Sequence, residues 1–560
     1  MTSRTGWTRF IIAATVLSLL SGCEGASPSK DTRAPTADAI ARADALLKDY
    51  TPNRPGLAVL VGRGKDILYE RNLGGADLEH GAPVTADTRF HVASVSKQFT
   101  AFAILLLARE GKLDLDADIH QYLPELAHYS SKVTVSELAH HTSGIRDQWE
   151  LLLLSGMHIE DLITQKQIMA MGVAQKGLNF EAGTDFAYSN MGYSLLAEIV
   201  ARVSGVPFRQ YLHEHIFAPL EMNSTLVYDD ATEMMVNRAM SYSIDAKGVV
   251  HLDRLNYSNY GATSLHTTTH DLLKWSRELL HPKVFPADLI RTAMSPGQLK
   301  DGRPITYGFG METTEFAGHR AIAHGGADAG YRTMIASFPD DDVSIVVFSN
   351  GAADVGAITN GLAEAFLGKR DDLPPVAVAD SAQAAKLAGL YTDGWGPGRK
   401  MVARNGKLYA KNGATDVQAT FLADGSFYFG SPSNRFRSTA NGDLVPVKPF
   451  GGVATTLRRV VRATPSAGEL QQIAGVYHSD ELDVTYRLAV SGDKLVLSTL
   501  RSDPQTLVPA EKDQFDSDDI RVSVVHNSGG RVSGIAVASG RVRNLIFARR
   551  DVGFERMPPK

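Results

Sequence analysis

Hydrophobic and polar positions divide the chain into stretches that predict different architectures. Early in the chain, LAVLVGRGKDILYERNLG predicts two strands joined by a turn at Gly62–Lys65. Helical patterns dominate the middle, and strand patterns return from Tyr307 before a last helix ends near residue 368. Because strands at both ends flank helices, we expect an α+β unit over residues 37–372. Its two ends should form one antiparallel sheet, with a helical insert between them.

The pattern changes after residues 371–379 (DDLPPVAVA), a proline-rich break. Short alternating strands and turns of Gly, Asn and Asp replace the helices. Leu387–Tyr391 (LAGLY) recurs as Ile473–Tyr477 (IAGVY), and each copy follows a short helical lead and opens about 85 residues of strand-rich sequence. We predict two small antiparallel β-barrel domains, which are residues 373–463 and 464–560.

Residues 1–22 have the pattern of an export signal. Arg4 and Arg9 precede FIIAATVLSLL, an apolar run that is short for a membrane span and ends in Leu-Ser-Gly-Cys, the bacterial lipoprotein box. Cys23 is the only cysteine, which excludes an intramolecular disulfide. We expect lipidation at Cys23 and a flexible tether over residues 23–36. The protein would then be anchored in the bacterial cell envelope, facing the periplasm or the exterior, with the choice of membrane left open.

Composition and charge argue against several other classes. The 560 residues carry a net charge of −5 without a basic tract, so nucleic acid is not an expected partner. His140 and His141 are adjacent rather than spaced like metal ligands, and we interpret them as structural. No cofactor is expected, because nothing in the sequence resembles a metal, nucleotide or redox site.

The candidate nucleophile opens the apolar stretch FHVASVSKQFTAFAILLLARE. Ser94 and Lys97 are spaced to lie one turn apart on one side of a buried helix. Burial and the positive end of the helix dipole both lower the pKa of a lysine, so Lys97 could accept a proton from Ser94. The same S-x-x-K pattern occurs twice more, in a linker and in a predicted hairpin turn, at Ser27/Lys30 and Ser491/Lys494.

Two further motifs follow in order along the chain. Tyr188-Ser189-Asn190 precedes an amphipathic helix; its phenol can relay a proton, and its amide can hold a substrate carbonyl or orient the lysine. A second Y-x-N pattern, at residues 257–259, has no helix behind it. His324-Gly325-Gly326 is the only H-x-G and lies on a predicted strand. The order S-x-x-K, Y-x-N, H-x-G is far more specific than any one motif.

With these motifs, residues 40 to 370 resemble the serine β-lactamase and penicillin-binding protein family, in its branch with Y-x-N and H-x-G. Further matches are GKLDLDADIHQYLPEL, ELAHHTSG, GTDFAYSNMGYSLLAEIV, PLEMNST and HGGADAGYRT. The resemblance implies that Ser94 is acylated and that Lys97 and Tyr188 handle its proton, with the choice of base open. It also implies a substrate-binding and oxyanion region made of Asn190, His324, Gly326 and the backbone N–H groups of Ser94 and Ala327.

The resemblance extends further to D-aminopeptidases, in which two antiparallel β-barrels follow the catalytic unit. In that group a loop of the last barrel reaches the active site. Residues 479–483 and 511–519 are acidic stretches that could approach a substrate amine, although solvated turns are the simpler interpretation.

The residue at position 324 guides the choice of substrate. A lysine there would be a fixed cation for a substrate carboxylate, whereas His324 is mostly neutral at pH 7 and Gly325 has no hydroxyl. We therefore predict a serine hydrolase that forms an acyl-enzyme on a small D-amino-acid peptide, amide or ester. The alternatives are a β-lactamase or D,D-carboxypeptidase, a broad carboxylesterase, and a non-catalytic lipoprotein that binds peptidoglycan or β-lactams.

Lipidation at Cys23 can be tested in cells. Because signal cleavage before a lipoprotein cysteine needs its own peptidase, a globomycin-type inhibitor should leave an unprocessed precursor on an immunoblot. Normal maturation under the inhibitor would show that Cys23 is not the anchor.

Overall fold

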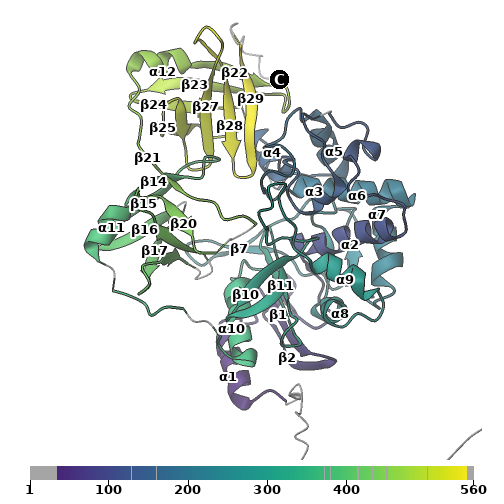
Figure 1. Cartoon of the computed structure of the whole chain (residues 1–560). Helices are drawn as coiled ribbons and strands as arrows, with labels where there is room; N and C mark the ends of the chain where they lie inside the picture. The colour runs from purple at the N-terminus through teal and green to yellow at the C-terminus, as the bar shows by residue number, and fades with distance from the viewer. Residues whose placement is uncertain are drawn as a thin grey trace, which may run out of the picture.

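The computed structural model describes residues 34–550, except positions 128, 159, 371–372, 379, 413–414, 431–433, 449–451 and 501. The predicted signal peptide, Cys23 and most of the tether lie outside the described residues. Three bodies are visible in Figure 1: an N-terminal unit that ends with α10, a β-sheet domain beside it, and a β-barrel above both. In this described part, no helix has the length and apolarity needed to cross a membrane.

A six-stranded antiparallel sheet forms the base of the N-terminal unit, in the order β10-β11-β12-β13-β1-β2. The first strand of the chain pairs with the last strand of the unit, from Leu57 opposite Ser349 to Arg63 opposite Val343. The predicted sheet built from both ends is therefore confirmed. Its strands are β1 (Leu57–Arg63), β2 (Asp66–Leu73), β10 (Glu312–Phe316), β11 (His319–Asp328), β12 (Tyr331–Phe338) and β13 (Val343–Ser349).

Helices cover both faces of this sheet. On one face, α1 (Ala37–Leu46) and α10 (Val355–Leu367) pack together and bury a compact apolar core. On the other face lies α8 (Thr269–Leu280), whose Trp275 is fully buried and donates an indole N–H to Gln98 Oε1 at 2.7 Å. That bond ties the sheet side of the molecule to the helical insert.

The helical insert surrounds one buried helix, α2 (Ser96–Arg109). The other helices are α3 (Val135–Ala139), α4 (Gln148–Leu154), α5 (Gln165–Ala174), α6 (Asn190–Ser204), α7 (Phe208–Leu212) and α9 (Ala287–Met294). Short strands lie between them: β3 (Gly75–Asp77), β4 (Ala82–Pro83), β5 (Phe90–His91), β6 (Leu226–Val227), β7 (Tyr242–Ile244), β8 (Val250–Leu252) and β9 (Leu265–Thr267).

One predicted strand begins later than its pattern suggested. We expected strand from Tyr307, but β10 starts at Glu312. The intervening chain passes against the start of α2, and at Gly310, where φ is +74°, a Cβ would collide with the backbone of Lys97. Close backbone approach therefore replaces sheet pairing here.

Two eight-stranded antiparallel sheets follow the N-terminal unit. The first runs β20-β19-β18-β17-β16-β15-β14-β21, and its ends are linked by reciprocal 2.8 Å backbone hydrogen bonds between Leu444 and Leu457. The second is a closed barrel of β22 to β29. Their strands are β14 (Gly389–Thr392), β15 (Arg399–Arg404), β16 (Lys407–Asn412), β17 (Thr415–Phe421), β18 (Phe427–Phe429), β19 (Arg435–Ser438), β20 (Leu444–Pro446), β21 (Arg458–Val460), β22 (Gly475–Ser479), β23 (Val484–Ser491), β24 (Lys494–Ser498), β25 (Gln505–Pro509), β26 (Gln514–Asp516), β27 (Ile520–His526), β28 (Val532–Ser539) and β29 (Val542–Arg550).

The repeated five-residue pattern marks the same helix-to-strand corner in both sheets. A short helix, α11 (Ser381–Leu387) or α12 (Ala467–Ile473), ends there and the first strand begins. The tyrosine hydroxyl donates back to the last helical residue, from Tyr391 to Leu387 O at 3.0 Å and from Tyr477 to Ile473 O at 2.5 Å. The repeat thus encodes a packed corner that closes each sheet.

Loss of this hydrogen bond should destabilise the barrel. Tyr477→Phe leaves the buried carbonyl of Ile473 without its partner, which should lower the free energy of unfolding by about 1–2 kcal/mol. Urea denaturation followed by intrinsic fluorescence measures the change, and Tyr409→Phe, a half-buried tyrosine on β16, is the control. An unchanged stability in Tyr477→Phe would contradict this role for the corner.

Candidate active site

Ser94 lies in a single 3₁₀ turn, Ala93–Val95, directly before α2. The sequence placed it on the α-helix itself, and this detail was wrong. Gly326 of β11 packs against Val92 and Ala93 so closely that a Cβ there would collide with the carbonyl oxygen of Val92. Ala93 takes a positive φ of 47°, which is uncommon for a residue other than glycine. The sheet edge therefore holds the serine in a tight turn, where its side chain is partly exposed.

Lys97, by contrast, is fully buried on the first turn of α2. Its Nζ lies 3.0 Å from Ser94 Oγ, 2.7 Å from Asn190 Oδ1 and 2.8 Å from the carbonyl oxygen of Ala262. Burial lowers the pKa of Lys97 to about 7. The two oxygens of Asn190 and Ala262 accept two N–H bonds, which leaves a neutral amine with its lone pair for the hydroxyl of Ser94.

Tyr188 reaches Ser94 from the other side. Its ring centroid is 4.8 Å from Lys97 Nζ, and its hydroxyl lies near the Ser94 side chain. Burial raises the pKa of Tyr188 well above its ordinary value, although the nearby Ser94 side chain opposes the shift. The phenol therefore stays protonated near neutral pH. His141 packs on its ring at 4.1 Å and accepts the Ser189 N–H at 3.1 Å, a structural role of the kind we predicted for this histidine.

Asn190 begins α6 and is held by an aspartate that sequence reasoning missed. Asp147 is fully buried, and its Oδ2 accepts both the backbone N–H (2.7 Å) and the side-chain amide (2.8 Å) of Asn190. Its Oδ1 accepts the Trp149 N–H and so caps α4. The only sequence signal was an N-cap residue before QWELLLL, and nothing in that signal pointed to Asn190.

The third motif, His324-Gly325-Gly326, contributes backbone groups to the site and no positive charge. His324 Nε2 lies 2.8 Å from the hydroxyl of Tyr307, and burial together with Lys97 lowers the pKa of His324 to about 3. The imidazole is therefore neutral, in line with the prediction. Further along β11, Gly326 packs against the Ser94 turn, and Ala327 is exposed at its edge. Ser94, Lys97, Tyr188, Asn190 and this segment of β11 thus meet at one place.

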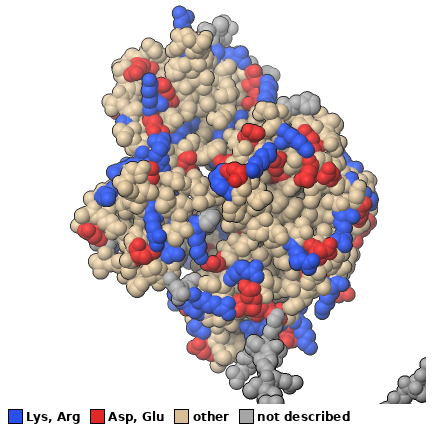
Figure 2. All heavy atoms as spheres, viewed as in Figure 1, with Lys and Arg blue, Asp and Glu red and all other residues tan. Residues whose placement is uncertain are grey.

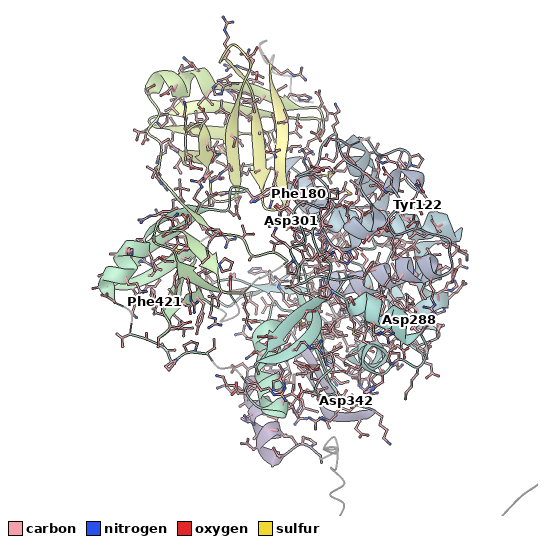
Figure 3. The ribbon with its side chains drawn as sticks, in the orientation of Figure 1. Tyr122, Phe180, Asp288, Asp301, Asp342 and Phe421 are labelled. Atoms are coloured by element: carbon pink, nitrogen blue, oxygen red, sulfur yellow. The ribbon has the colours of Figure 1, made fainter. Side chains whose placement is uncertain are left out.

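A residue of the C-terminal barrel also reaches this place. Gly540 and Arg541 form the turn between β28 and β29, and Figure 1 shows this end of the two strands directed at the N-terminal unit. The Arg541 guanidinium lies over the Tyr188 ring, with its carbon 5.5 Å from the centroid. In Figure 3, the labelled Phe180 marks the region where barrel and unit meet.

This hairpin is fixed by main-chain hydrogen bonds. Asn179 pairs with it twice, through Nδ2 to Arg541 O at 2.9 Å and through Oδ1 to Arg543 N at 2.7 Å. The buried guanidinium of Arg146 donates to the carbonyls of Arg543 (3.1 Å) and Asn544 (2.9 Å) and to the carboxylate of Glu481 (2.6 Å). Glu481, from one of the acidic stretches, thus serves the domain interface.

The other candidate patterns lie elsewhere or have no comparable partners. Ser491 and Lys494 flank the exposed turn between β23 and β24, as predicted. Residues 257–259 form a buried loop near the site, with no helix following directly. In the described ranges, no group of three His, Cys, Asp or Glu side chains could hold a metal ion.

Comparisons with known proteins agree with this arrangement. The family model described as Beta-lactamase matches residues 40–369. A D-aminopeptidase of Gluconobacter oxydans (strain 621H) is 26% identical over 518 residues, covering 88% of this chain and 96% of that protein. A penicillin-binding protein of Bacillus subtilis (strain 168) is 28% identical over 378 residues, covering 63% of this chain and 82% of its own length.

Solved structures show the same fold at lower identity. The octameric penicillin-binding protein homologue from Pyrococcus abyssi aligns with a TM-score of 0.53 at 19% identity. The alignment covers 82% of this chain and 97% of that one. The N-terminal unit and the sheets that follow it are therefore similar to a known arrangement.

The environment of Lys97 predicts a pH-dependent nucleophile. A group with a pKa of about 7 is neutral above that pH, so the rate of Ser94 modification by a fluorophosphonate should rise from pH 5.5 to 8.5 with a midpoint of about 7. Lys97→Arg, whose guanidinium stays charged, should lower the rate at least about 100-fold. Lys494→Arg is the matched control in the exposed S-x-x-K. A flat pH profile would show that Lys97 does not handle the proton.

Proposed function

The chain belongs to the β-lactamase family of serine hydrolases, and we propose that within it this protein is a D-stereospecific peptidase or amidase that acts through an acyl-enzyme on Ser94. The observation that carries the proposal is the hydrogen bond between Ser94 and Lys97, beside the Tyr188 ring. A partly exposed hydroxyl lies 3.0 Å from an amine whose pKa is about 7. Such a pair is an activated nucleophile with its base.

Lys97 is the acylation base in this proposal. The neutral amine takes the proton of Ser94 as its Oγ bonds to the substrate carbonyl carbon, which gives a tetrahedral intermediate. The Tyr188 hydroxyl then donates its proton to the leaving nitrogen as the C–N bond breaks, and Lys97 returns a proton to the phenolate. Water attacks the resulting ester in the second half-reaction, and Ser94 regains its proton.

Backbone N–H groups stabilise the oxyanion of the intermediate in this mechanism. We assign this role to Ser94 and Ala327, because the Ser94 turn packs directly on β11 at Gly326 and Ala327 is exposed beside it. Asn190 holds Lys97 through its Oδ1 and is itself held by Asp147. Preorganised donors of this kind contribute much of the rate in acyl transfer.

The preference for D-amino-acid substrates rests on similarity along most of the chain. The match to the Gluconobacter D-aminopeptidase covers 88% of this chain, which is more than the catalytic unit alone. The neutral His324 also supports it, because the position lacks the fixed cation expected for β-lactam or D,D-carboxypeptidase substrates. Arg541 keeps D,D-carboxypeptidase action as a second candidate, since it places a cation in the site by another route.

We also propose that the protein works in the bacterial cell envelope, held by a lipid on Cys23. The support is the lipoprotein box and the polar tether that follows it. Substrates are then small peptides, amides or esters of the envelope.

A turnover panel tests the proposed function. We expect the full-length protein to release product from D-alanine p-nitroanilide and from D-Ala-D-Ala, with little release from L-alanine p-nitroanilide or nitrocefin. Ser94→Ala should lower each rate at least about 1,000-fold, because it removes the nucleophile. Ser491→Ala, in the exposed S-x-x-K, is the matched control and should leave the rates unchanged.

Other results would favour the alternatives. Turnover of a p-nitrophenyl ester alone would indicate a general esterase, and fast nitrocefin hydrolysis would indicate a β-lactamase. Absence of turnover with Ser94-dependent penicillin labelling would indicate a carboxypeptidase or a binding protein.

A further inference from the structure

Arg541 is the one guanidinium on the described chain that lies over the Tyr188 ring, and the proposed mechanism does not use it. It comes from the barrel and not from the catalytic unit. The turn that carries it packs tightly, since a Cβ at Gly540 would collide with the carboxylate of Glu150. Its position over the Tyr188 ring is therefore set by the docking of two domains.

The hairpin is also docked by contacts that do not involve the Arg541 side chain. Docking uses backbone atoms of Arg541, Arg543 and Asn544, which are bound by Asn179 and Arg146. The structure includes no hydrogen bond from the Arg541 guanidinium to any described residue.

The nearby carboxylates do not use all the N–H donors of the Arg541 guanidinium. Arg541 forms two long ion pairs, with Nη2 3.5 Å from Asp147 Oδ1 and Nε 3.7 Å from Glu150 Oε1, and both distances are longer than those of hydrogen bonds. Asp147 already accepts three N–H bonds from Asn190 and Trp149. The Arg541 side chain keeps 36% of its surface exposed, so a ligand can reach it.

In the proposed mechanism, the leaving group lies in the space beside Arg541. Tyr188 donates to the leaving nitrogen in the proposed mechanism, and Arg541 lies over the same ring. A guanidinium matches a carboxylate through two parallel N–H bonds. We infer that Arg541 is a specificity residue that binds a carboxylate on the leaving group, so that the preferred leaving group is an amino acid with a free carboxyl. The inference rests on the proposed function, because it takes Tyr188 as the proton donor.

This assignment bears on two interpretations of the sequence. The acidic stretches of the last barrel were interpreted chiefly as solvated turns that could approach a substrate amine, whereas Arg541 is the barrel side chain that lies over Tyr188, and Glu481 is bound by Arg146. The lack of a cation at His324 argued against carboxylate recognition, yet Arg541 supplies one. Figure 2 shows positive and negative side chains mixed over the visible face, so no broad surface field explains this local charge.

A matched pair of dipeptides tests the inference on the full-length protein. D-Ala-D-Ala and D-Ala-D-Ala amide differ only in the carboxylate of the leaving group. We expect kcat/KM to favour the acid roughly ten-fold or more, because a charge-assisted bidentate pair is lost with the amide. Arg541→Gln should bring the ratio close to one, and Arg541→Lys should keep part of it.

Two controls distinguish a change in substrate specificity from a loss of folded protein. Arg531→Gln makes the same charge change at the other end of β28 and should keep the full ratio. Thermal melting of Arg541→Gln checks the fold. The ratio of kcat/KM for the two dipeptides does not change when part of the protein is inactive, because both values fall by the same factor. A change of both substrates by the same factor would indicate a general electrostatic role and overturn the inference.

Binding to Ser94→Ala separates this inference from the proposed function. Calorimetry with the same two dipeptides needs no turnover. Tighter binding of the acid that disappears in Ser94→Ala/Arg541→Gln supports the inference even if no D-peptide is cleaved. Turnover of D-Ala-D-Ala with equal rates for acid and amide refutes the inference while the proposed function stands.

Discussion

The active site depends on the burial of one ammonium group. Lys97 is fully enclosed, and a pKa near 7 in place of 10.5 means that its charged form is disfavoured by on the order of 5 kcal/mol relative to water. Two fixed acceptors, Asn190 Oδ1 and the Ala262 carbonyl, prevent the amine from turning away from Ser94. Removing charge from the lysine and fixing its lone pair are thus two results of the same packing.

Each neighbour of Lys97 is fixed by a different part of the fold. Asp147, at the start of α4, holds Asn190 at the start of α6, so two helix ends position one amide. The sheet fixes the Ser94 turn through Gly326, and Thr333 of β12 donates to Val92 O at 2.9 Å. Because these supports come from distant parts of the chain, the site forms only when the sheet and the helical insert are packed together.

Local patterns predicted much of this arrangement, and long-range packing decided the rest. A sequence pattern directly records which residues of a short segment are buried. Such patterns predicted the strands β1 and β13, the buried helix α2 and the two LAGLY-like corners. Asp147 and Arg541 carry no such pattern. An aspartate before a helix and an arginine in a hairpin turn are both common on protein surfaces. Their roles here come from distant partners, Asn190 for Asp147 (43 residues away) and Tyr188 for Arg541 (353 residues away).

The late start of β10 and the 3₁₀ turn at Ser94 have the same origin. At both places a glycine, Gly310 or Gly326, lets one backbone approach another more closely than a side chain allows. Two glycines of the later domains instead allow a close approach to side chains of the N-terminal unit. Gly540 packs against the Glu150 carboxylate, and Gly452 of the first β-sheet domain packs against the Phe186 ring, two residues before Tyr188. Both domains after the catalytic unit therefore contact the segment that carries Tyr188, and the last barrel places Arg541 over the Tyr188 ring itself.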